Sequence, residues 1–465
     1  MTRIKKVKQM DLTQGIIWKQ LLLFALPLLG SSFIQQLYNT VDLLFVGNFI
    51  GKEASAAVGA SSLMITCLVG FFSGMSVGSG VILSQKIGAK SEREIHDTIH
   101  TAVCLSFIGG VTLTVIGYLL APHFMQWMNT PEQIMQSAVS YLRIYFLSLT
   151  SVIIYNIGSG LIRAMGDSRS PMLIQLAGGL VNVAMDTFFV VCFKNGVEGV
   201  AWATMFSQTA AAGSVLFYLV RQKGNYHLSL NKLKIHGAIW KDIVKVGIPA
   251  GIQSFVITLS NVFAQYYINS FSVDVIAAFT AYIKVELPIY LPIVAFGQAV
   301  TTFVGQNKGA GNQERMEKGT FICAGLSVCI TLVMSSLMLV FGKYAFGLFN
   351  KDVQVINYGI EIIHISFPFY WIYAILEVIA SSLRGEGKSL PPMVIILCNI
   401  CVLRTVLLCL IMGLYHDVRG IAVTYPITWS LTVICLMAYY LMHKKINKLK
   451  KGARRVLYQE RDTIK

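Results

Sequence analysis

The chain has 465 residues, of which 55% are hydrophobic and 13% charged, and its mean hydropathy is +0.63. A soluble protein carries about 25% charged residues, so this chain has too few to cover the surfaces of several soluble domains, and a large water-soluble enzyme is excluded. The net charge of +16 would suit nucleic-acid binding, but the positions of the charges indicate a membrane topology instead. We therefore expect no nucleic-acid partner.

Twelve apolar stretches are long enough to cross a bilayer core about 30 Å thick, which needs roughly 20 helical residues. They lie at 17–46, 53–84, 96–120, 133–162, 171–192, 198–220, 247–271, 275–305, 316–342, 355–383, 391–414 and 419–442. The sequence therefore predicts an all-α membrane protein with twelve transmembrane helices.

The basic residues divide unevenly between alternate loops. Thirty of the 38 Lys and Arg lie in the two ends and the even-numbered loops, whereas five lie in the odd-numbered loops. Because basic residues accumulate on the cytoplasmic side of a membrane, we expect a multi-pass plasma (inner) membrane protein with both termini in the cytoplasm. The basic segments 221–246 and 443–465 are then a cytoplasmic linker and a cytoplasmic tail facing anionic lipid.

The two halves of the chain resemble each other. LPLLGSSFIQQLYN at 26–39 matches IPAGIQSFVITLSN at 248–261, with Pro27 at the position of Pro249. Further along, SQKIGAKSER at 84–93 matches GQNKGAGNQER at 305–315, and SGLIRAMGDSRSPM at 159–172 matches SSLRGEGKSLPPM at 381–393. The offset is 221 or 222 throughout. Because six spans separate equivalent positions, we predict two parallel six-helix repeats, 1–220 and 247–442, around a central cleft, a plan typical of transporters. A duplicated structural membrane protein is the alternative.

A polar stripe runs along the first span. Gln35, Tyr38, Asn39 and Asp42 follow the spacing i, i+3, i+4 and i+7, which places them on one helical face. An ionised side chain at the bilayer centre costs about 2.5–3.5 kcal/mol, so it usually marks function. A helix-packing seam with interhelical hydrogen bonds is the alternative interpretation.

A second stripe runs along the fifth span, where Gln175, Asn182 and Asp186 share one face. Asn182 and Asp186 lie one turn apart, roughly 6 Å along the axis. Gly178 and Gly179 lie on the same face and allow another helix to approach closely. An amide and a carboxylate on one turn suit a proton-sharing network or a small cation held by oxygen ligands.

The repeat distinguishes residues that both halves share, which make the fold, from polar residues that occur in only one half. Asp42, Asn182 and Asp186 correspond to Ala264, Leu403 and Leu407, so we expect ion coupling in the N-terminal half. The C-terminal half carries Glu377 and Arg404, which we interpret as a structural or gating pair if their helices touch, with direct substrate contact as the alternative. Lys284 and Glu286 lie two residues apart and do not face each other on a helix.

The combined blocks PLLGSSFIQQLYNTVDLLFVG, GSGVILSQKIGA, LIRAMGDSRSP, LVNVAMDTFFV, GQNKGAG and LRGEGKSLPP resemble multidrug and toxic compound extrusion (MATE) transporters, most closely the DinF-like prokaryotic branch. The resemblance implies two six-helix bundles around a central cleft that exports amphipathic, often cationic compounds in exchange for H⁺ or Na⁺. It implies ion coupling at Asp42, Asn182, Asp186, Thr204 and Tyr141, with Asp42, Asn182, Asp186 and Thr204 as Na⁺ ligands if Na⁺ is the ion. Substrate is expected at Gln35, Tyr38, Asn39, Asn156 and Gln175.

We therefore expect a monomeric secondary active multidrug exporter that works by alternating access within the lipid bilayer. The sequence has no P-loop or nucleophile elbow, so an ion gradient is the expected energy source, with no cofactor beyond the coupling ion and no enzymatic activity. The alternative is a flippase for a lipid-linked precursor. That function would need a cationic cleft for a pyrophosphate group, and the mainly acidic charges within the spans disfavour it.

Overall fold

The protein is described by a computed structural model that covers residues 9–415 and 417–463. Within this part of the chain, twelve helical segments are long and apolar enough to cross a membrane. The prediction of an all-α protein with twelve transmembrane helices is therefore confirmed. Residues 1–8 and 464–465, the ends of the first predicted repeat and of the predicted tail, lie outside the described residues.

The first half contains six spans. Its helices are α1 (Ile17–Phe45), α2 (Lys52–Gly88), α3 (Glu92–Trp127), α4 (Glu132–Ala164), α5 (Arg169–Asp186) and α6 (Gly196–Val220). Two π-helical segments, Val46–Ile50 and Thr187–Cys192, continue α1 and α5. Both segments follow directly on the helices that carry the predicted acids.

The second half repeats this order with two interruptions. Its helices are α7 (Gly237–Ile268), α8 (Val273–Gly309), α9 (Gln313–Gly347), α10 (Val353–Ser366), α11 (Tyr370–Gly385), α12 (Leu390–Ile396), α13 (Arg404–Leu414) and α14 (Val418–Thr463). The 3₁₀ turn Phe367–Phe369, which contains Pro368, divides the tenth span into α10 and α11. The π-helical segment Leu397–Leu403 joins α12 to α13 within the eleventh span.

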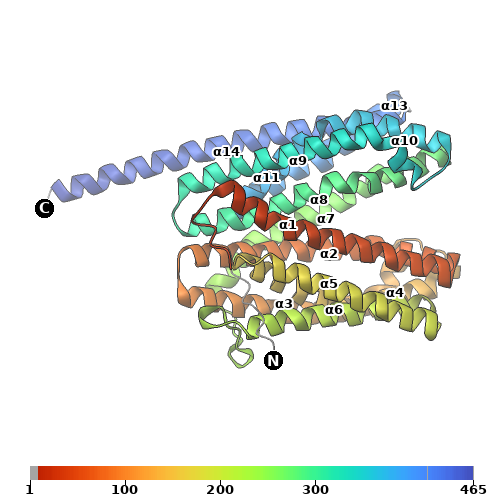
Figure 1. The fold of residues 1–465 in the computed structure, drawn as a ribbon, viewed down its shortest axis with the longest axis horizontal. Coiled ribbons are helices and arrows are strands. Elements are labelled where there is room, and N and C mark those ends of the chain that lie inside the picture. The colour runs from red at the N-terminus through yellow and green to blue at the C-terminus, as the bar shows by residue number, and fades with distance from the viewer. Residues whose placement is uncertain (1–8, 416, 464–465) are drawn as a thin grey trace.

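The helices of the two halves lie side by side along most of their length. Figure 1 shows α2 to α6 on one side of the molecule, α8 to α14 on the other, and α1 running between them. The seam between α2 and α7 is tight because glycines meet: a side chain at Gly74 or Gly78 would overlap the backbone at Gly251 or Gly247. Small residues therefore hold the halves together along one seam.

Helix α1 belongs to both halves. Near its start, Leu21, Phe24 and Leu28 are buried in the same apolar cluster as Phe296 and Val300 of α8. Further along, α1 packs against α5 of its own half. Pro27 lies inside α1, where it removes one backbone hydrogen bond and favours a bend between these two stretches.

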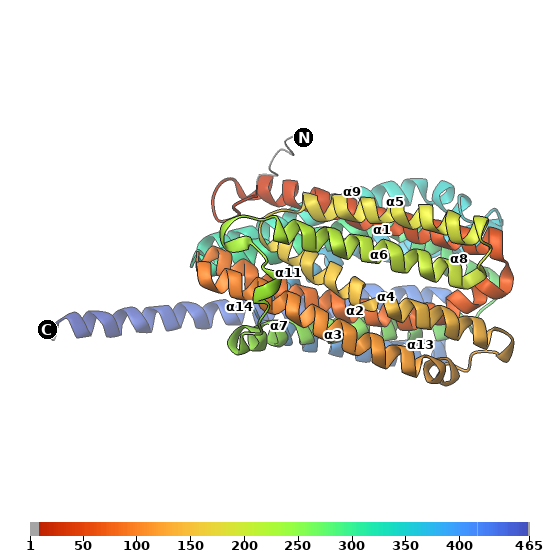
Figure 2. The ribbon, with the colours of Figure 1, turned by 90° about the horizontal axis from the view of Figure 1, so that it is seen from below.

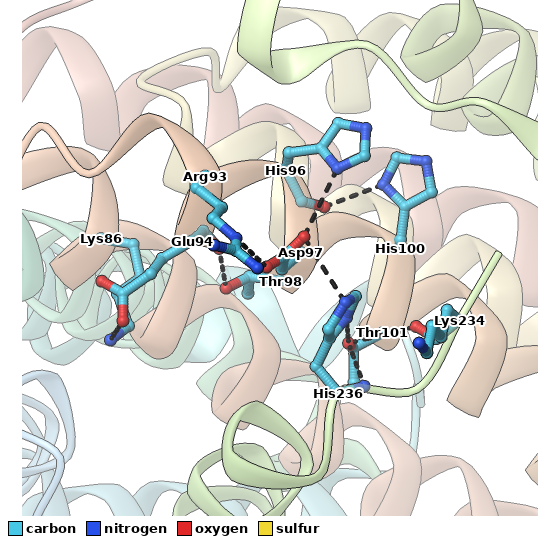
Figure 3. A network of polar contacts seen from close by, with 10 residues as sticks. All are labelled: Lys86, Arg93, Glu94, His96, Asp97, Thr98, His100, Thr101, Lys234 and His236. Carbon is cyan, nitrogen blue, oxygen red and sulfur yellow. Dashed lines mark hydrogen bonds and ion pairs between the residues drawn. The ribbon is translucent and has the colours of Figure 1, made fainter. Parts of the chain in front are cut away.

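The connection between the halves is docked on α3 (Figure 3). The backbone N–H of Ser229 donates to His100 Nε2 at 3.0 Å, and that of His236 donates to the Thr101 hydroxyl at 3.1 Å. The His236 ring also lies 3.6 Å from the Asp97 carboxylate. Helix α7 begins at Gly237, inside the segment predicted as linker, because the polar start of α7 continues the helix beyond its apolar part.

The last helix is longer than its apolar span. The predicted span ends at residue 442, whereas α14 continues to Thr463. Figure 2 shows the end of α14 projecting well beyond the helical bundle. The basic C-terminal segment therefore continues the helix of the last span as far as Thr463.

Candidate functional site

The two predicted acids come together between α1 and α5. The carboxyl group of Asp42 interacts with both Asn182 and Asp186. Asp186 is 0% exposed and Asn182 is 1% exposed, whereas Asp42 is partly covered. The helical spacing of the sequence thus brings two acids and one amide into one buried cluster, which we call the acid–amide cluster (Asp42, Asn182 and Asp186).

Five of the six side-chain polar atoms of this cluster are buried without a hydrogen-bond partner. Within the described residues, both carboxylate oxygens of Asp186, both side-chain polar atoms of Asn182 and Oδ1 of Asp42 are buried without a partner in hydrogen-bonding geometry. An unsatisfied buried polar atom is costly and rare. Oxygen atoms in this arrangement suit a bound proton shared between carboxylates or a small hard cation.

Tyr141 on α4 forms the wall of the acid–amide cluster. It is 7% exposed, and its phenol group lies within electrostatic range of both Asp42 and Asp186. Thr204 on α6 is partly covered, and its hydroxyl group donates to the Val200 carbonyl of its own helix at 3.1 Å. Of the two positions carried over from the family resemblance, Tyr141 therefore adjoins the acids, whereas the Thr204 hydroxyl is engaged within α6.

A small cavity lies beside the cluster, between α1, α5 and α6. Its volume is about 10 Å³, which is roughly the space for one water molecule. It is lined by Tyr38, Gln175, Gly178, Gly179, Asn182, Ser207, Gln208 and Ala211. Three of the predicted residues, Tyr38, Gln175 and Asn182, therefore share one polar chamber.

The glycines of α5 explain this close packing. A Cβ atom at Gly179 would lie 3.5 Å from the Tyr38 ring, and one at Gly178 would lie 3.5 Å from the Cβ of Ala211. The absence of side chains on this face lets α1 and α6 approach α5 from two sides, as the sequence pattern predicts.

The predicted stripe on α1 divides between two environments. Tyr38 and Asp42 are partly covered and turn toward α5, whereas Gln35 and Asn39 are exposed. The remaining predicted substrate residue, Asn156 on α4, is partly covered, and its amide donates to the Val152 carbonyl at 2.9 Å. The stripe therefore has an inner edge at the acid–amide cluster and an outer edge open to a ligand or lipid.

Both acids lie next to π-helical backbone. Asp186 is the last residue of α5, directly before Thr187–Cys192, and Asp42 lies four residues before Val46–Ile50. A π-helical turn widens the helix and leaves its backbone more adaptable, which is why such turns are frequent at functional sites. Neither segment is indicated by the residue pattern.

The pairing expected between Glu377 and Arg404 is wrong. Arg384 Nη2 lies 2.6 Å from Glu377 Oε1, and the Ser381 hydroxyl donates to the same oxygen at 2.9 Å. Arg384 takes this role because it follows Glu377 by seven residues, two turns along the same face of α11.

Arg404 instead contacts α14. Its Nη2 donates to the Thr428 hydroxyl at 3.3 Å, and its guanidinium carbon lies 4.5 Å from the centre of the Tyr425 ring. A cation over an aromatic face is stabilised by the ring quadrupole. The carboxyl group of Glu286 on α8 lies within electrostatic range of Arg404 and next to the Tyr370 hydroxyl. Lys284 is exposed on the opposite side of α8.

Sequence reasoning missed three residues of this region. Ser207 and Gln208 line the small cavity, and with Thr204 they form the spacing i, i+3 and i+4 on α6. That polar stripe, in AWATMFSQ, was a usable signal. Arg384 was recognisable by its spacing from Glu377, but only the structure shows that no other helix supplies a closer base within the described residues.

The described residues form twelve spans in two repeated halves, which is the plan of a multi-pass membrane protein of a transporter fold. The sequence model of the MatE family matches residues 27–188 and 249–410, and the chain belongs to this family of multidrug efflux transporters. The two matched segments coincide with the two halves of the internal repeat.

Individual relatives agree with this membership. The chain is 29% identical over 401 residues to the probable multidrug resistance protein YpnP of Bacillus subtilis, covering 86% of this chain and 89% of that protein. It is 26% identical over 398 residues to a probable multidrug resistance protein NorM of Thermotoga maritima, covering 83% and 84%. Its fold is similar to an outward-facing multidrug resistance MATE transporter structure, with a TM-score of 0.87 at 21% identity, covering 94% of this chain and 98% of that one.

Proposed function

We propose that this chain is a cation-coupled exporter of amphipathic or cationic organic compounds, driven by H⁺ or Na⁺ through alternating access. Its proposed place is the plasma membrane, with both termini in the cytoplasm and a monomer as the working unit. The single observation that carries the proposal is the acid–amide cluster, whose buried carboxylate and amide atoms lack partners among the described residues.

The proposed exchange follows from the position of the cluster. Asp42 belongs to α1, which packs on both halves, whereas Asn182 and Asp186 belong to α5. A cation bound between them removes the repulsion of two buried carboxylates and draws α1 against α5. Loss of that cation leaves two like charges facing each other and favours separation of the two helices. Ion binding is thereby coupled to the position of α1. Because Pro27 favours a bend in α1, ion binding is also coupled to the bending of this helix.

Substrate binding is proposed on the adjoining polar residues Gln35, Tyr38, Asn39, Asn156 and Gln175. A cationic compound near Asp42 competes with the coupling ion for the same negative charge, so the two cannot occupy the site together. Such competition is sufficient for antiport, because each bound species converts the protein between its two open forms. Apolar and aromatic surfaces of the substrate would contact Tyr38 and the apolar residues around it.

The test uses substitutions that remove charge and keep shape. Asp42→Asn and Asp186→Asn, expressed at the native level in cells that lack other drug exporters, are expected to abolish drug resistance and dye efflux. Glu361→Gln is the matched control, because Glu361 lies in a span but pairs with Arg419 at the exposed surface at 3.0 Å. Full efflux by the Asp42→Asn and Asp186→Asn proteins would contradict the proposal.

A further inference from the structure

A repeated motif outside the acid–amide cluster joins the two halves at one end of the molecule. Gln85 at the end of α2 donates from Nε2 to the carbonyl of Gly385 at 2.9 Å. Gln306 at the end of α8 donates from Nε2 to the carbonyl of Ala164 at 2.9 Å. Both donors and both acceptors differ by 221 residues, so the same hydrogen bond is made twice, once in each direction between the halves.

Two glycines bring these helix ends into contact. A side chain at Gly88 would overlap the carbonyl oxygen of Gln306, and one at Gly309 would overlap the carbonyl oxygen of Gln85. These overlaps are with backbone, which cannot swing aside as a flexible side chain can. Glycine at both positions therefore allows α2 and α8 to touch where each glutamine reaches the opposite half.

The segment before α1 closes over the same junction. The N–H of Met10 donates to the Gly166 carbonyl of the first half at 3.0 Å. The N–H of Leu12 donates to Gln306 Oε1 of the second half at 3.0 Å, and the Leu12 side chain is 0% exposed. We call residues 10–16 the N-terminal strap, since they bind both halves.

Arg315 on α9 anchors the N-terminal strap. Its guanidinium group donates to the carbonyl oxygens of Leu12, Gln14 and Gly15 at 3.2, 3.0 and 2.8 Å. Three hydrogen bonds from one charged group fix the strap more strongly than neutral donors would.

The second half has its own strap. The segment 229–236 before α7 docks on α3 (Figure 3). In the same way, the segment 10–16 before α1 docks on α9. Helices α3 and α9 are equivalent in the repeat, so each half sends the segment before its first helix onto the third helix of the other half. This linker strap is held by His100 and Thr101, with Asp97 beside His236.

We propose that these contacts form a clasp that closes the cytoplasmic end of the central cleft and sets how readily the protein opens inward. The clasp consists of Gln85, Gly88, Gln306, Gly309 and the N-terminal strap. The inference rests on the proposed alternating access and on the proposed orientation. Separation of the halves at this end must break both glutamine bonds and release the strap, so the clasp stabilises the form closed on the inside and limits substrate loading from the cytoplasm.

The clasp is tested by a distance across it. Spin labels carried by unnatural amino acids at Glu92 and Asn312, both exposed, report separation of α3 from α9 in the full-length protein in lipid. In the Gln85→Ala, Gln306→Ala double variant, which loses three hydrogen bonds, the population with the longer distance is expected to rise at least about fivefold, since the loss of one such bond alone corresponds to about that ratio. Gln313→Ala is the control, because that glutamine bonds Glu317 within the same helix at 3.2 Å.

A second variant tests the strap without touching the glutamines. In Arg315→Gln, hydrogen–deuterium exchange at the amides of Met10 and Leu12 is expected to accelerate together with the rise in the longer distance. An unchanged distance distribution in both the double variant and Arg315→Gln, in folded protein, would overturn the clasp. If the distances change as expected but the protein shows no cation-driven efflux, the proposed function is wrong. The clasp would then still control opening of the cleft, in a protein driven by another energy source.

Discussion

The two halves of this transporter share their packing but not their buried charges. In the first half, Asp42 and Asp186 face each other, and no Lys or Arg pairs with either among the described residues. In the second half, Glu377 is bound by Arg384 at 2.6 Å. Positions 156 and 163 of the first half, equivalent to Glu377 and Arg384, are Asn156 and Arg163. The two halves therefore share the contacts that make the fold, but Glu377 in the second half has a base beside it, whereas Asp42 and Asp186 in the first half have none among the described residues.

This difference assigns different tasks to buried acids. A carboxylate with a base beside it contributes to structure, whereas a carboxylate without one can bind a positive ion. We infer that ion exchange belongs to the first half and mechanical support to the second.

The largest effect is expected from giving the first half a permanent base. Asn182→Lys places an ammonium group beside Asp42 and Asp186, which mimics the Arg384 arrangement of the second half. Transport coupled to an ion gradient should then be lost while the protein still folds, because the lysine occupies the place of the coupling ion. Ion-driven dye efflux from proteoliposomes measures this loss, and the Asn182→Gln protein controls for volume. Retained efflux in Asn182→Lys would show that the acids need not exchange an ion.

Breaking the pair in the second half should instead cost stability. Arg384→Ala leaves the Glu377 carboxylate buried without its base, which is expected to destabilise the protein by about 3 kcal/mol. Thermal unfolding in detergent measures the change. Arg419→Ala, which breaks the exposed pair with Glu361, should cost much less, because solvent screens an ion pair at the surface. Equal losses of stability in the two variants would mean that the pair of Glu377 and Arg384 has no special structural role.

A smaller effect is expected from crowding the interface beside the acids. A Cβ at Gly179 would make an ordinary contact 3.5 Å from the Tyr38 ring, so Gly179→Ala should be tolerated. Gly179→Leu should reduce transport severalfold, because its side chain must push α1 away from α5. Transport assays on both variants at matched expression check this size dependence. An inactive Gly179→Ala protein beside an active Gly179→Leu protein would contradict it.

The smallest expected effect is a change in the pH dependence of stability, and it arises from Glu386 in the second half. Burial raises the pKa of Glu386, although Lys388 and His443 lie 3.8 and 3.4 Å from its Oε2. A raised carboxyl pKa in the folded state contributes stability at acidic pH that is lost as the pH rises through that value. Glu386→Gln should therefore gain stability relative to the native chain between pH 5 and pH 8. Unfolding temperatures at the two pH values measure the gain, and an opposite trend would mean that the two cations outweigh burial.

Much of the fold follows from the sequence because a bilayer imposes strong rules. Apolar length fixed the twelve spans, and the spacing of Pro27 and Pro249 revealed the repeat. The interruptions of the second half were not predictable: the π-helical segment Leu397–Leu403 replaces a few helical bonds within an evenly apolar stretch. The helical extension of α14 to Thr463 was missed because apolar composition, rather than helix propensity, defined the span.

The acid–amide cluster was predictable to a similar degree. Helical periodicity placed Asn182 and Asp186 on one face, and the glycines beside them indicated a close neighbour. Periodicity alone does not say which helices meet, so the predicted partner of Glu377 was wrong. For the same reason, Gln85 and Gln306 were recognisable only as equivalent positions of the repeat, and not as contacts between the halves. Contacts between the halves depend on tertiary packing, which no spacing within one helix contains.

In the proposed mechanism, Asp42 and Asp186 hold an ion that the substrate displaces. The most direct measurement is the release of H⁺, or of Na⁺ in a parallel titration, when a cationic dye binds the purified full-length protein in weakly buffered solution. We predict release of one of these ions from the native chain and from Glu377→Gln, and none from Asp42→Asn or Asp186→Asn with dye bound. Undiminished release from those two variants, or its loss only in Glu377→Gln, would contradict the account.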